Sequence, residues 1–385
     1  MVGAGTQASR LRTSSHPHIP YLSSAEHCLH SQCVDQSSAY KGVPRLTINI
    51  AIATYDAIVL GCDSLSSQVE QAILPFRNGG GFARDADGNE LIDATGHKVV
   101  SAAELRPYVT NVFGGAQKMF CLYEDEDTTV AAVTSGMATL CGVTIAGVAN
   151  RFKKRNAGEG ATFRTVQAVV EAFLAHVRQE WEAEVEYATA PEELRPYFPD
   201  LQFIVGGYGT DDASSKVFKL SVSALTVEEQ FAWRSRSGTC FAGQSDFVER
   251  LLVGVDGRLA DQINVTVGQL MASQAPAIVQ AFTDQLRAAG GEIPDGFTFS
   301  TPGSPVELPW WDSVARIDFG NLPAQYAVDL AELLVNLQSG MQRFASGVAT
   351  VGGRTHIGVL KRGEKFVMLN EPKLVHNHTG YSHDL

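Results

Sequence analysis

The sequence predicts an α+β fold in which antiparallel sheets carry helices on their outer faces. Short apolar segments that alternate or run together between turn residues are typical of strands. Longer segments space their apolar residues by three and four positions, which is typical of amphipathic helices. These segments come in groups, in the order strands, helices, strands, helices, strands. A parallel sheet would instead need strict alternation of strands and helices.

The first predicted strands form a hairpin. Alternating isoleucines occupy 48–52, Tyr55 and Asp56 make a turn, and 57–62 is a nearly continuous apolar run that predicts a buried strand. A second pair of strands is predicted at 108–122 and 129–134, joined by the acidic turn 124–127. The later strands are predicted at 201–208, 216–222, 229–234, 356–360 and 365–369.

Two helices are predicted to follow the second strand pair. The first would bury Met137, Leu140, Cys141, Thr144, Ile145 and Val148. The second would bury Val166, Val169, Val170, Phe173, Leu174, Val177 and Trp181. Further helices are predicted at 247–252, 267–286 and 326–337, and Pro276 is expected to kink or divide the middle one.

Composition and charge exclude several classes of protein. The chain has 385 residues, of which 44% are hydrophobic and 19% charged, so it has enough apolar material for a folded core. Its 42 acidic residues outnumber its 30 basic ones, so nucleic acid is not an expected partner. No apolar run approaches the roughly 18 residues that span a bilayer, so no membrane partner is expected. Six scattered cysteines without a preceding secretory segment predict a reducing, cytoplasmic setting.

The first 46 residues differ from the rest of the chain. They are rich in Ser, His and Gly and contain no acidic residue before Glu26. This composition predicts an arm or propeptide, with a targeting segment or an overlong start as alternatives. The spacing of His27, Cys28, His30 and Cys33 matches no standard zinc site, so no metal is expected there.

Three stretches interrupt the pattern of strands and helices and are expected to be insertions. They lie near 70–107, 187–199 and 290–319, and residues 373–385 are expected to form a tail. Trp310 and Trp311 in the third stretch are expected to cap a cleft, meet an interface, or cover a small separate core.

A segment of the first insertion resembles the start of a calcium-binding loop. Asp85, Asp87 and Asn89 have the right spacing, but Gly88 stands at the fourth loop position and Gly96 where a bidentate glutamate is needed. We therefore interpret this segment as a hairpin turn.

The segment TINIAIATYDAIVLGCDS, residues 47–64, resembles the opening of proteasome β-subunits and their bacterial relatives in the threonine peptidase family. Two further segments, AQKMF at 116–120 and VAAVTSGMA at 130–138, resemble the bacterial ancestral-type β-subunits. The resemblance implies a four-layer αββα N-terminal-nucleophile hydrolase domain over 47–372. It implies a peptide or protein substrate, no cofactor, no metal and a homo-oligomer, and it assigns site roles to Thr47, Asp63, Lys118, Gly136 and Ser346.

The chemistry of these residue types agrees with the roles that the resemblance implies. A threonine hydroxyl needs a base beside it, and a chain-terminal α-amine with a pKa of about 7.7–8.0 suits that task. Proteolysis before Thr47 would create this amine. Lys118 would hold the amine neutral, Asp63 would keep the lysine charged, and the Gly136 N–H would face the oxyanion. Taken singly, a threonine at an accessible strand start, a turn aspartate and a solvated lysine are ordinary structural features.

Several positions depart from the pattern of the resembled family. Leu46 stands where self-processing members have glycine, and Ala242 replaces a supporting serine in AGQS, with Ser245 as a candidate substitute. In RFASG, Ser346 and Gly347 match, but Arg343 takes the place of an aspartate.

Three functions therefore remain open from the sequence. The first is a threonine-type peptidase, and the second is a non-catalytic ring or scaffold subunit that retains residues 1–46. The third is an amidase of small molecules, with the insertions narrowing its cleft.

Overall fold

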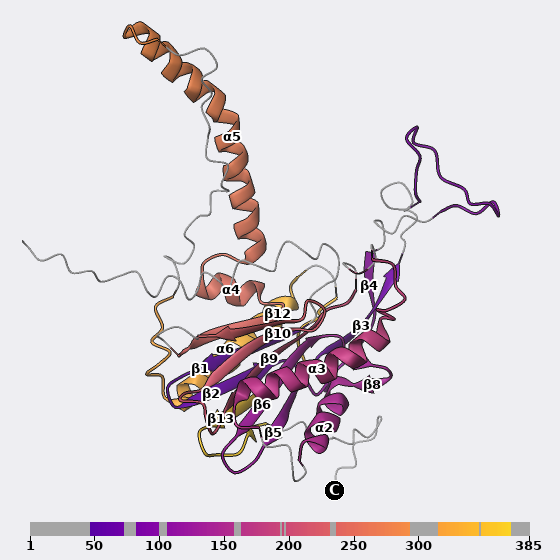
Figure 1. The fold of residues 1–385 in the computed structure, drawn as a ribbon, viewed down its shortest axis with the longest axis vertical. Helices are drawn as coiled ribbons and strands as arrows, with labels where there is room; N and C mark the ends of the chain where they lie inside the picture. Colours follow the sequence, from indigo (N-terminus) through magenta and orange to yellow (C-terminus); the bar gives the residue numbers. More distant parts are fainter. Residues whose placement is uncertain are drawn as a thin grey trace, which may run out of the picture.

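The described part of the chain is built on two five-stranded antiparallel sheets, which confirms the α+β class (Figure 1). The computed structural model describes residues 47–72, 82–99, 106–157, 163–192, 195, 198–231, 236–292, 315–345 and 348–370. The first sheet has the strand order β12 (Gly238–Gly243), β1 (Ile48–Ala53), β2 (Ala57–Cys62), β13 (His356–Lys361) and β14 (Val367–Met368). The second has the order β11 (Thr226–Gln230), β10 (Lys216–Ser221), β9 (Leu201–Tyr208), β6 (Thr129–Gly136) and β5 (Met119–Glu124).

The two sheets pack face to face through an apolar layer. Alternation in β1 assigns each face of the strand, because Ala51 and Ala53 contact the second sheet whereas the isoleucines point the other way. Both faces of β1 and β2 are buried, which accounts for the nearly unbroken apolar sequence of these strands. The inter-sheet layer contains Ile58, Leu60, Met119, Ala131, Val133, Ile204, Val217 and Leu360.

Helices cover the outer faces of both sheets. On the second sheet, α2 (Ile145–Arg155) and α3 (Val166–Glu184) contribute to one apolar cluster with the outward side chains of β5, β6 and β9. On the first sheet, α4 (Asp246–Leu252) and α6 (Ala324–Gln342) pack on the isoleucines of β1. All seven apolar residues predicted for the buried face of the helix at 166–181 are buried in α3.

Two elements project from the same end of the body (Figure 1). One is the ribbon of β3 (Ser66–Ala72) and β4 (Arg106–Phe113), which pair with each other and with no other described strand. The other is α5 (Gly257–Ala288), a helix of 32 residues in which no residue is buried. Pro276 was expected to kink or divide a helix over 267–286; it lies inside α5 and does not divide it, and the helix is longer than predicted at both ends.

The predicted strand 108–122 is wrong, because the chain divides it between β4 and β5. Gly114 and Gly115 interrupt it, and Gly115 has a φ of +76°. The part before them joins the projecting ribbon, and only the part from Met119 onward belongs to the main sheet.

The first predicted helix begins later than its apolar spacing suggested. Cys141 and Gly142 have positive φ values and turn the chain between β7 (Thr139–Leu140) and β8 (Val143–Thr144). Helix α2 therefore starts at Ile145, where the Thr144 hydroxyl accepts a hydrogen bond from the Gly147 N–H. Leu140 is still buried in the same cluster, but Cys141 and Thr144 are exposed.

Two strands near the middle of the chain also differ from expectation. The strand predicted at 229–234 is β11, which ends at Gln230 before Phe231 takes a φ of +60°. Strand β12 was not predicted, although it pairs with β1 along its whole length.

The segment around Asp85 forms the turn that its sequence suggested. The Asp85 Oδ1 accepts hydrogen bonds from the N–H groups of Asp87 and Asn89, at 3.0 and 2.8 Å, and Arg84 bridges to Glu90. Trp310, Trp311, the arm 1–46 and the tail 373–385 lie outside the described residues.

Candidate active site

Thr47 lies immediately before β1, next to the end of β12. Its side chain is 4% exposed, so the expectation of an accessible strand residue is wrong. The Thr47 carbonyl accepts a hydrogen bond from the Gln244 N–H at 2.5 Å, and Ile48 pairs with Gly243 in the register of β1 and β12. The end of β12 therefore fixes the backbone of Thr47.

Asp63 follows β2 directly, beside Thr47, and is 1% exposed. Its Oδ1 accepts from the Ile48 N–H at 3.2 Å, and its Oδ2 accepts from the N–H groups of Leu65 and Gly352 at 3.1 and 3.0 Å. An ionised carboxylate can accept about four such bonds. The backbone thus stabilises a charged carboxylate in a buried position.

Lys118 precedes β5 of the second sheet and connects the other two residues. Its Nζ donates to the Thr47 Oγ1 at 2.7 Å and to the Asp63 Oδ1 at 2.9 Å. The lysine is 7% exposed. Hydrogen bonds that involve an ionised group are roughly twice as strong as neutral ones, and burial strengthens them further. The buried Lys118 side chain therefore lies between the Thr47 hydroxyl and the Asp63 carboxylate.

Gly136 ends β6, the strand beside β5, at the same end of the second sheet as Lys118. Thr134, two residues before Gly136, donates its N–H to the Lys118 carbonyl at 3.0 Å. Gly136 has a φ of +102°, and a Cβ there would lie 2.2 Å from the Asp200 carbonyl oxygen. Only glycine fits this position.

Gly243 holds the Thr47 backbone from the other side. It has a φ of +81°, and a Cβ there would lie 1.9 Å from the Thr47 carbonyl oxygen. The same point lies 3.5 Å from the Cβ of Ser135, a buried residue whose hydroxyl has no hydrogen-bond partner in the described structure. Gly243 and Ser135 were not predicted as site residues.

We expect Gly243→Ala to lower the free energy of unfolding by about 2–5 kcal/mol, from positive-φ strain and an overlap that must displace Thr47. Denaturant titration measures this cost. Gly363→Ala is the matched control, because Gly363 has a φ of +72° but nothing within 4 Å of its Cβ position. It should lose only about 1–2 kcal/mol. Equal losses in the two variants would show that Gly243 does not constrain Thr47.

Among the described residues, the supporting positions expected from the sequence have other surroundings than a direct contact with the Thr47 hydroxyl. The Ser245 hydroxyl donates to the Glu249 Oε1 at 2.5 Å at the start of α4. Arg343 is exposed at the end of α6, and Ala242 lies in β12 opposite Asn49. Ser346, Gly347 and Leu46 lie outside the described residues.

Three polar residues that the sequence reading missed lie close to the Lys118–Asp63 pair. Asn49, Cys62 and His356 are buried on the inter-sheet side of the first sheet. Burial raises the pKa of the Cys62 thiol and lowers the pKa of the His356 imidazole, and the charges of Lys118 and Asp63 act on both. A signal was available, because Asn49 interrupts an otherwise apolar alternation in the first strand.

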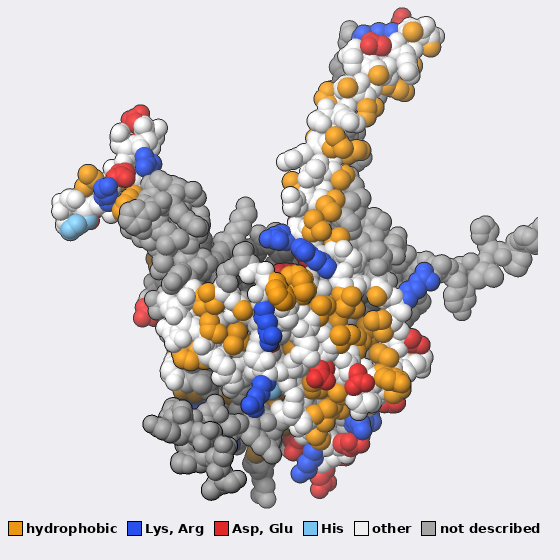
Figure 2. All heavy atoms as spheres, turned by 180° about the vertical axis from the view of Figure 1, so that it is seen from behind, with side chains coloured by type: hydrophobic (Ala, Val, Ile, Leu, Met, Phe, Trp, Pro, Cys, Tyr) orange, Lys and Arg blue, Asp and Glu red, His pale blue; other side chains and the backbone are white. Residues whose placement is uncertain are grey.

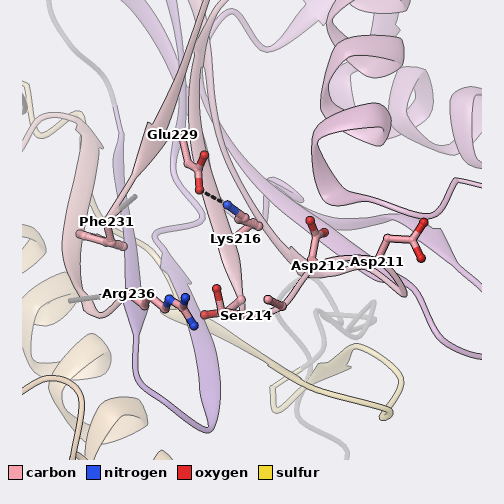
Figure 3. A pocket seen from close by; sticks show the side chains of 9 residues that line it. Asp211, Asp212, Ser214, Lys216, Glu229, Phe231 and Arg236 are labelled. Atoms are coloured by element: carbon pink, nitrogen blue, oxygen red, sulfur yellow. Dashed lines mark hydrogen bonds and ion pairs between the residues drawn. The ribbon is translucent and has the colours of Figure 1, made fainter. Parts of the chain in front are cut away.

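A polar hollow elsewhere on the molecule is a separate feature (Figure 3). Lys216, which begins β10, lies at the end of the second sheet opposite to Gly136. Three of the charged groups here have protein partners: Lys216 pairs with Glu229, Asp211 with Arg164, and Asp212 with the Val166 N–H. Its lining residues are Asp211, Asp212, Ala213, Ser214, Ser215, Lys216, Glu229, Phe231 and Arg236.

The described ranges offer no cluster of side chains for a metal ion and no helix that could span a membrane. No group of three or more His, Cys, Asp or Glu side chains there could hold a metal ion. Among the helices of these ranges, none is long and apolar enough to cross a membrane.

Comparisons with known proteins give only remote relations. No model of a known protein family matches the chain, and no curated protein matches it. Similar solved structures include the helical assembly of the Anbu complex from Pseudomonas aeruginosa, at 13% identity and a TM-score of 0.38, covering 84% of this chain and 88% of that one. Anbu, an ancestral β-subunit, from Yersinia bercovieri matches at 9% identity and a TM-score of 0.40, with the same coverage. An Anbu variant from Hyphomicrobium sp. strain MC1 matches at 9% and 0.39, covering 84% and 87%.

These findings correct the family assignment made from the sequence. The prediction of a proteasome β-subunit-type hydrolase of the threonine peptidase family is wrong, because the similar structures are Anbu proteins and the relation is remote. The resemblance rested mainly on three short segments, which form the hairpin β1–β2, the residues around Lys118 and most of β6. Such segments do not determine the rest of the chain, which includes the ribbon β3–β4 and α5. The contacts among Thr47, Asp63 and Lys118 are the features that bear most directly on function.

Proposed function

We propose that the protein is a threonine-type amidohydrolase, acting on peptide bonds, in which Thr47 becomes the N-terminal nucleophile after residues 1–46 are removed. The observation that supports this proposal is the position of Lys118, whose Nζ donates to both the Thr47 Oγ1 and the Asp63 Oδ1. A lysine in solvent or an aspartate in a turn would not need to be buried. Nor would it need the hydrogen bonds that join Lys118 to Thr47 and Asp63. The outer helices on both sheets support a four-layer αββα arrangement of the domain over 47–372.

The proposed reaction begins with the α-amine of Thr47. The neutral amine takes the proton from the Thr47 hydroxyl as its oxygen attacks the substrate carbonyl carbon. Lys118 stabilises the negative charge that develops on Oγ1, and Asp63 keeps the ammonium charged and fixed. The Gly136 N–H is the proposed donor to the substrate oxyanion.

The second half of the reaction restores the enzyme. The protonated amine gives its proton to the leaving nitrogen, so that an amine product departs and an ester remains on the Thr47 Oγ1. The neutral amine then takes a proton from water as the water oxygen attacks the ester carbonyl, and it returns this proton to the Thr47 Oγ1 as the acid product leaves.

Cleavage before Thr47 is the condition on which this mechanism depends. While the preceding peptide bond is intact, the Thr47 nitrogen is an amide and cannot act as a base. Intact mass measurement combined with turnover of fluorogenic peptide amides tests the proposal. We expect a mass loss that corresponds to residues 1–46 together with hydrolysis. A chain that begins with Thr47 and hydrolyses no member of a broad peptide panel would contradict it.

A non-catalytic scaffold subunit is the second candidate function, and α5 is the observation that favours it. This helix has no buried residue, and 262–283 contains no Asp, Glu, Lys or Arg. Hydrophobic side chains follow its length (Figure 2). Those most exposed include Val265, Leu270, Met271, Ile278 and Phe282. Retention of residues 1–46 in the purified protein would favour the scaffold over the hydrolase.

For either function we propose a homo-oligomer in which α5 packs against a second copy of the chain, because an apolar helix of this length is costly to leave in water. Light scattering should give a multiple of the 41.4 kDa chain mass, or of the shortened chain. Leu270→Glu combined with Ile278→Glu should shift the protein to a smaller species.

Leu225→Glu is the control for this prediction, because Leu225 is 54% exposed but lies in the turn between β10 and β11. It should leave the mass unchanged. A monomer for the unmodified protein at all micromolar concentrations would defeat the proposal.

A further inference from the structure

Asn49, Cys62 and His356 form a continuous row across three neighbouring strands. The register pairs Asn49 of β1 with Cys62 of β2, and Cys62 with His356 of β13. Directly paired residues point to the same face of a sheet, with Cβ atoms about 4.5–5.5 Å apart. This face meets the second sheet, because Cys62 belongs to the inter-sheet cluster with Met119. All three side chains are at most 1% exposed.

The row contains polar atoms that lack partners. Neither Oδ1 nor Nδ2 of Asn49 has a hydrogen-bond partner among the described residues, and neither ring nitrogen of His356 has one. Buried polar groups in folded proteins are nearly always hydrogen-bonded, to protein or to ordered water. Buried water typically makes about three hydrogen bonds to such groups. The Asn49 amide can both donate and accept, and the His356 imidazole can accept. Together they offer the roughly three hydrogen bonds that a buried water typically makes.

The row adjoins the Lys118–Asp63 pair. Cys62 directly precedes Asp63, and the charges of Lys118, Asp63 and Arg354 all act on His356. An ammonium group has three N–H donors, of which two are directed to Thr47 and Asp63. No hydrogen bond of the third donor is found among the described residues.

We propose that Asn49, Cys62 and His356 bind buried water that accepts the third Lys118 N–H and thereby orients the ammonium toward the Thr47 Oγ1. This inference rests on the proposed function, and it makes the three side chains positioning residues that touch no substrate. Water accepts from Lys118 and from the Asn49 Nδ2, and it donates to the Asn49 Oδ1 and to a nitrogen of neutral His356. The Cys62 thiol borders the site as a weak partner.

Protonation of His356 would disrupt this arrangement. The imidazolium cannot accept a hydrogen bond, and it adds a second cation beside Lys118. Burial lowers the pKa of His356, Lys118 and Arg354 also lower it, and Asp63 opposes them. The unfolded chain therefore binds a proton at His356 more readily than the folded chain, so stability is lost as the pH falls below the ordinary histidine pKa of about 6.5. In His356→Gln this part of the pH dependence should be absent.

The experiment compares Asn49→Leu with Asn49→Ser in the processed protein. Leucine removes both polar functions, and serine keeps a donor and an acceptor. We expect kcat to fall at least about tenfold in Asn49→Leu with KM unchanged, since a displacement of about 1 Å at a reacting group can cost about 100-fold. Thermal stability should change little, because an amide whose hydrogen bonds are made to water is replaced by an apolar group. Serine should restore most of the turnover.

Thr239→Val is the control for this comparison, since the Thr239 hydroxyl also lacks a partner but pairs with Ile52, toward the other end of β1. Its kcat should not change. A high-resolution crystal structure of the unmodified protein supplies a readout independent of activity, with water expected between Asn49, His356 and Lys118.

The outcomes separate this inference from the proposed function. If the protein is inactive but holds the water, the hydrolase proposal fails and the water site stands. If the protein is active and the layer is dry, or if Asn49→Leu keeps full kcat, the inference is overturned.

Discussion

Thr47→Ala should abolish hydrolysis of peptide amides by the processed chain, with a loss of about 10⁴-fold or more in kcat/KM. The substitution removes the only atom proposed to form the acyl intermediate, and loss of a nucleophile leaves the residual effect of binding and oxyanion contacts. Stability should fall by only about 0.5–1.5 kcal/mol, because the hydrogen bond from Lys118 is lost while Asp63 still binds the ammonium. Fluorogenic peptide turnover and denaturant titration measure the two effects.

Thr47→Ser is the matched control, since it retains the hydroxyl and loses one methyl group. It should keep measurable turnover. Equal turnover in Thr47→Ala and the unmodified chain would remove Thr47 from the reaction and leave the Lys118 contact as a structural feature.

Asp63→Asn should destabilise the fold by about 3–5 kcal/mol and reduce turnover strongly, because it leaves a buried lysine without its counter-ion. It also presents an NH₂ group to backbone donors at Ile48, or at Leu65 and Gly352, where an acceptor is required. Lys118→Ala should cost less stability, since the carboxylate keeps its three backbone donors, but it should lower turnover to a similar degree.

Asp93→Asn is the control for the aspartate variant. Asp93 also accepts three hydrogen bonds within a few residues, from the Thr95 N–H and hydroxyl and from the His97 N–H, but it is exposed in the first insertion. Its substitution should cost no more than about 1 kcal/mol. If Asp63→Asn costs as little as Asp93→Asn, the Lys118–Asp63 pair does not hold the site together.

The strands around Thr47 could be predicted because their sequence and their burial agree. β1 and β2 are buried on both faces, so their apolar runs indicate strands without reference to the rest of the chain. Strand β12 escaped prediction because its sequence, GTCFAG, has glycine at both ends and gains its pairing only from β1. The helix expected over 137–148 failed at Cys141 and Gly142, where positive φ values override the apolar spacing.

Only part of the candidate site could be predicted from the sequence, because its contacts depend on how the two sheets pack. Thr47, Asp63 and Lys118 were chosen because a resemblance aligned them, and their contacts require the two sheets to meet, which no local pattern specifies. Asn49 and His356 escaped notice because one polar residue in a strand does not reveal what faces it across a sheet. Ser245 was a reasonable substitute from its spacing, but the start of α4 engages it with Glu249.

The most direct test of the central claim is to locate the nucleophile by its covalent product. A chain released from a fusion so that Thr47 is its first residue is treated with a β-lactone, which acylates nucleophilic hydroxyl and thiol groups, and is then mapped by peptide mass spectrometry. We expect one acyl group on Thr47, and we expect this group to be absent in Lys118→Ala under the same treatment. An unmodified Thr47, with acylation confined to an accessible thiol such as the exposed Cys141, would contradict it.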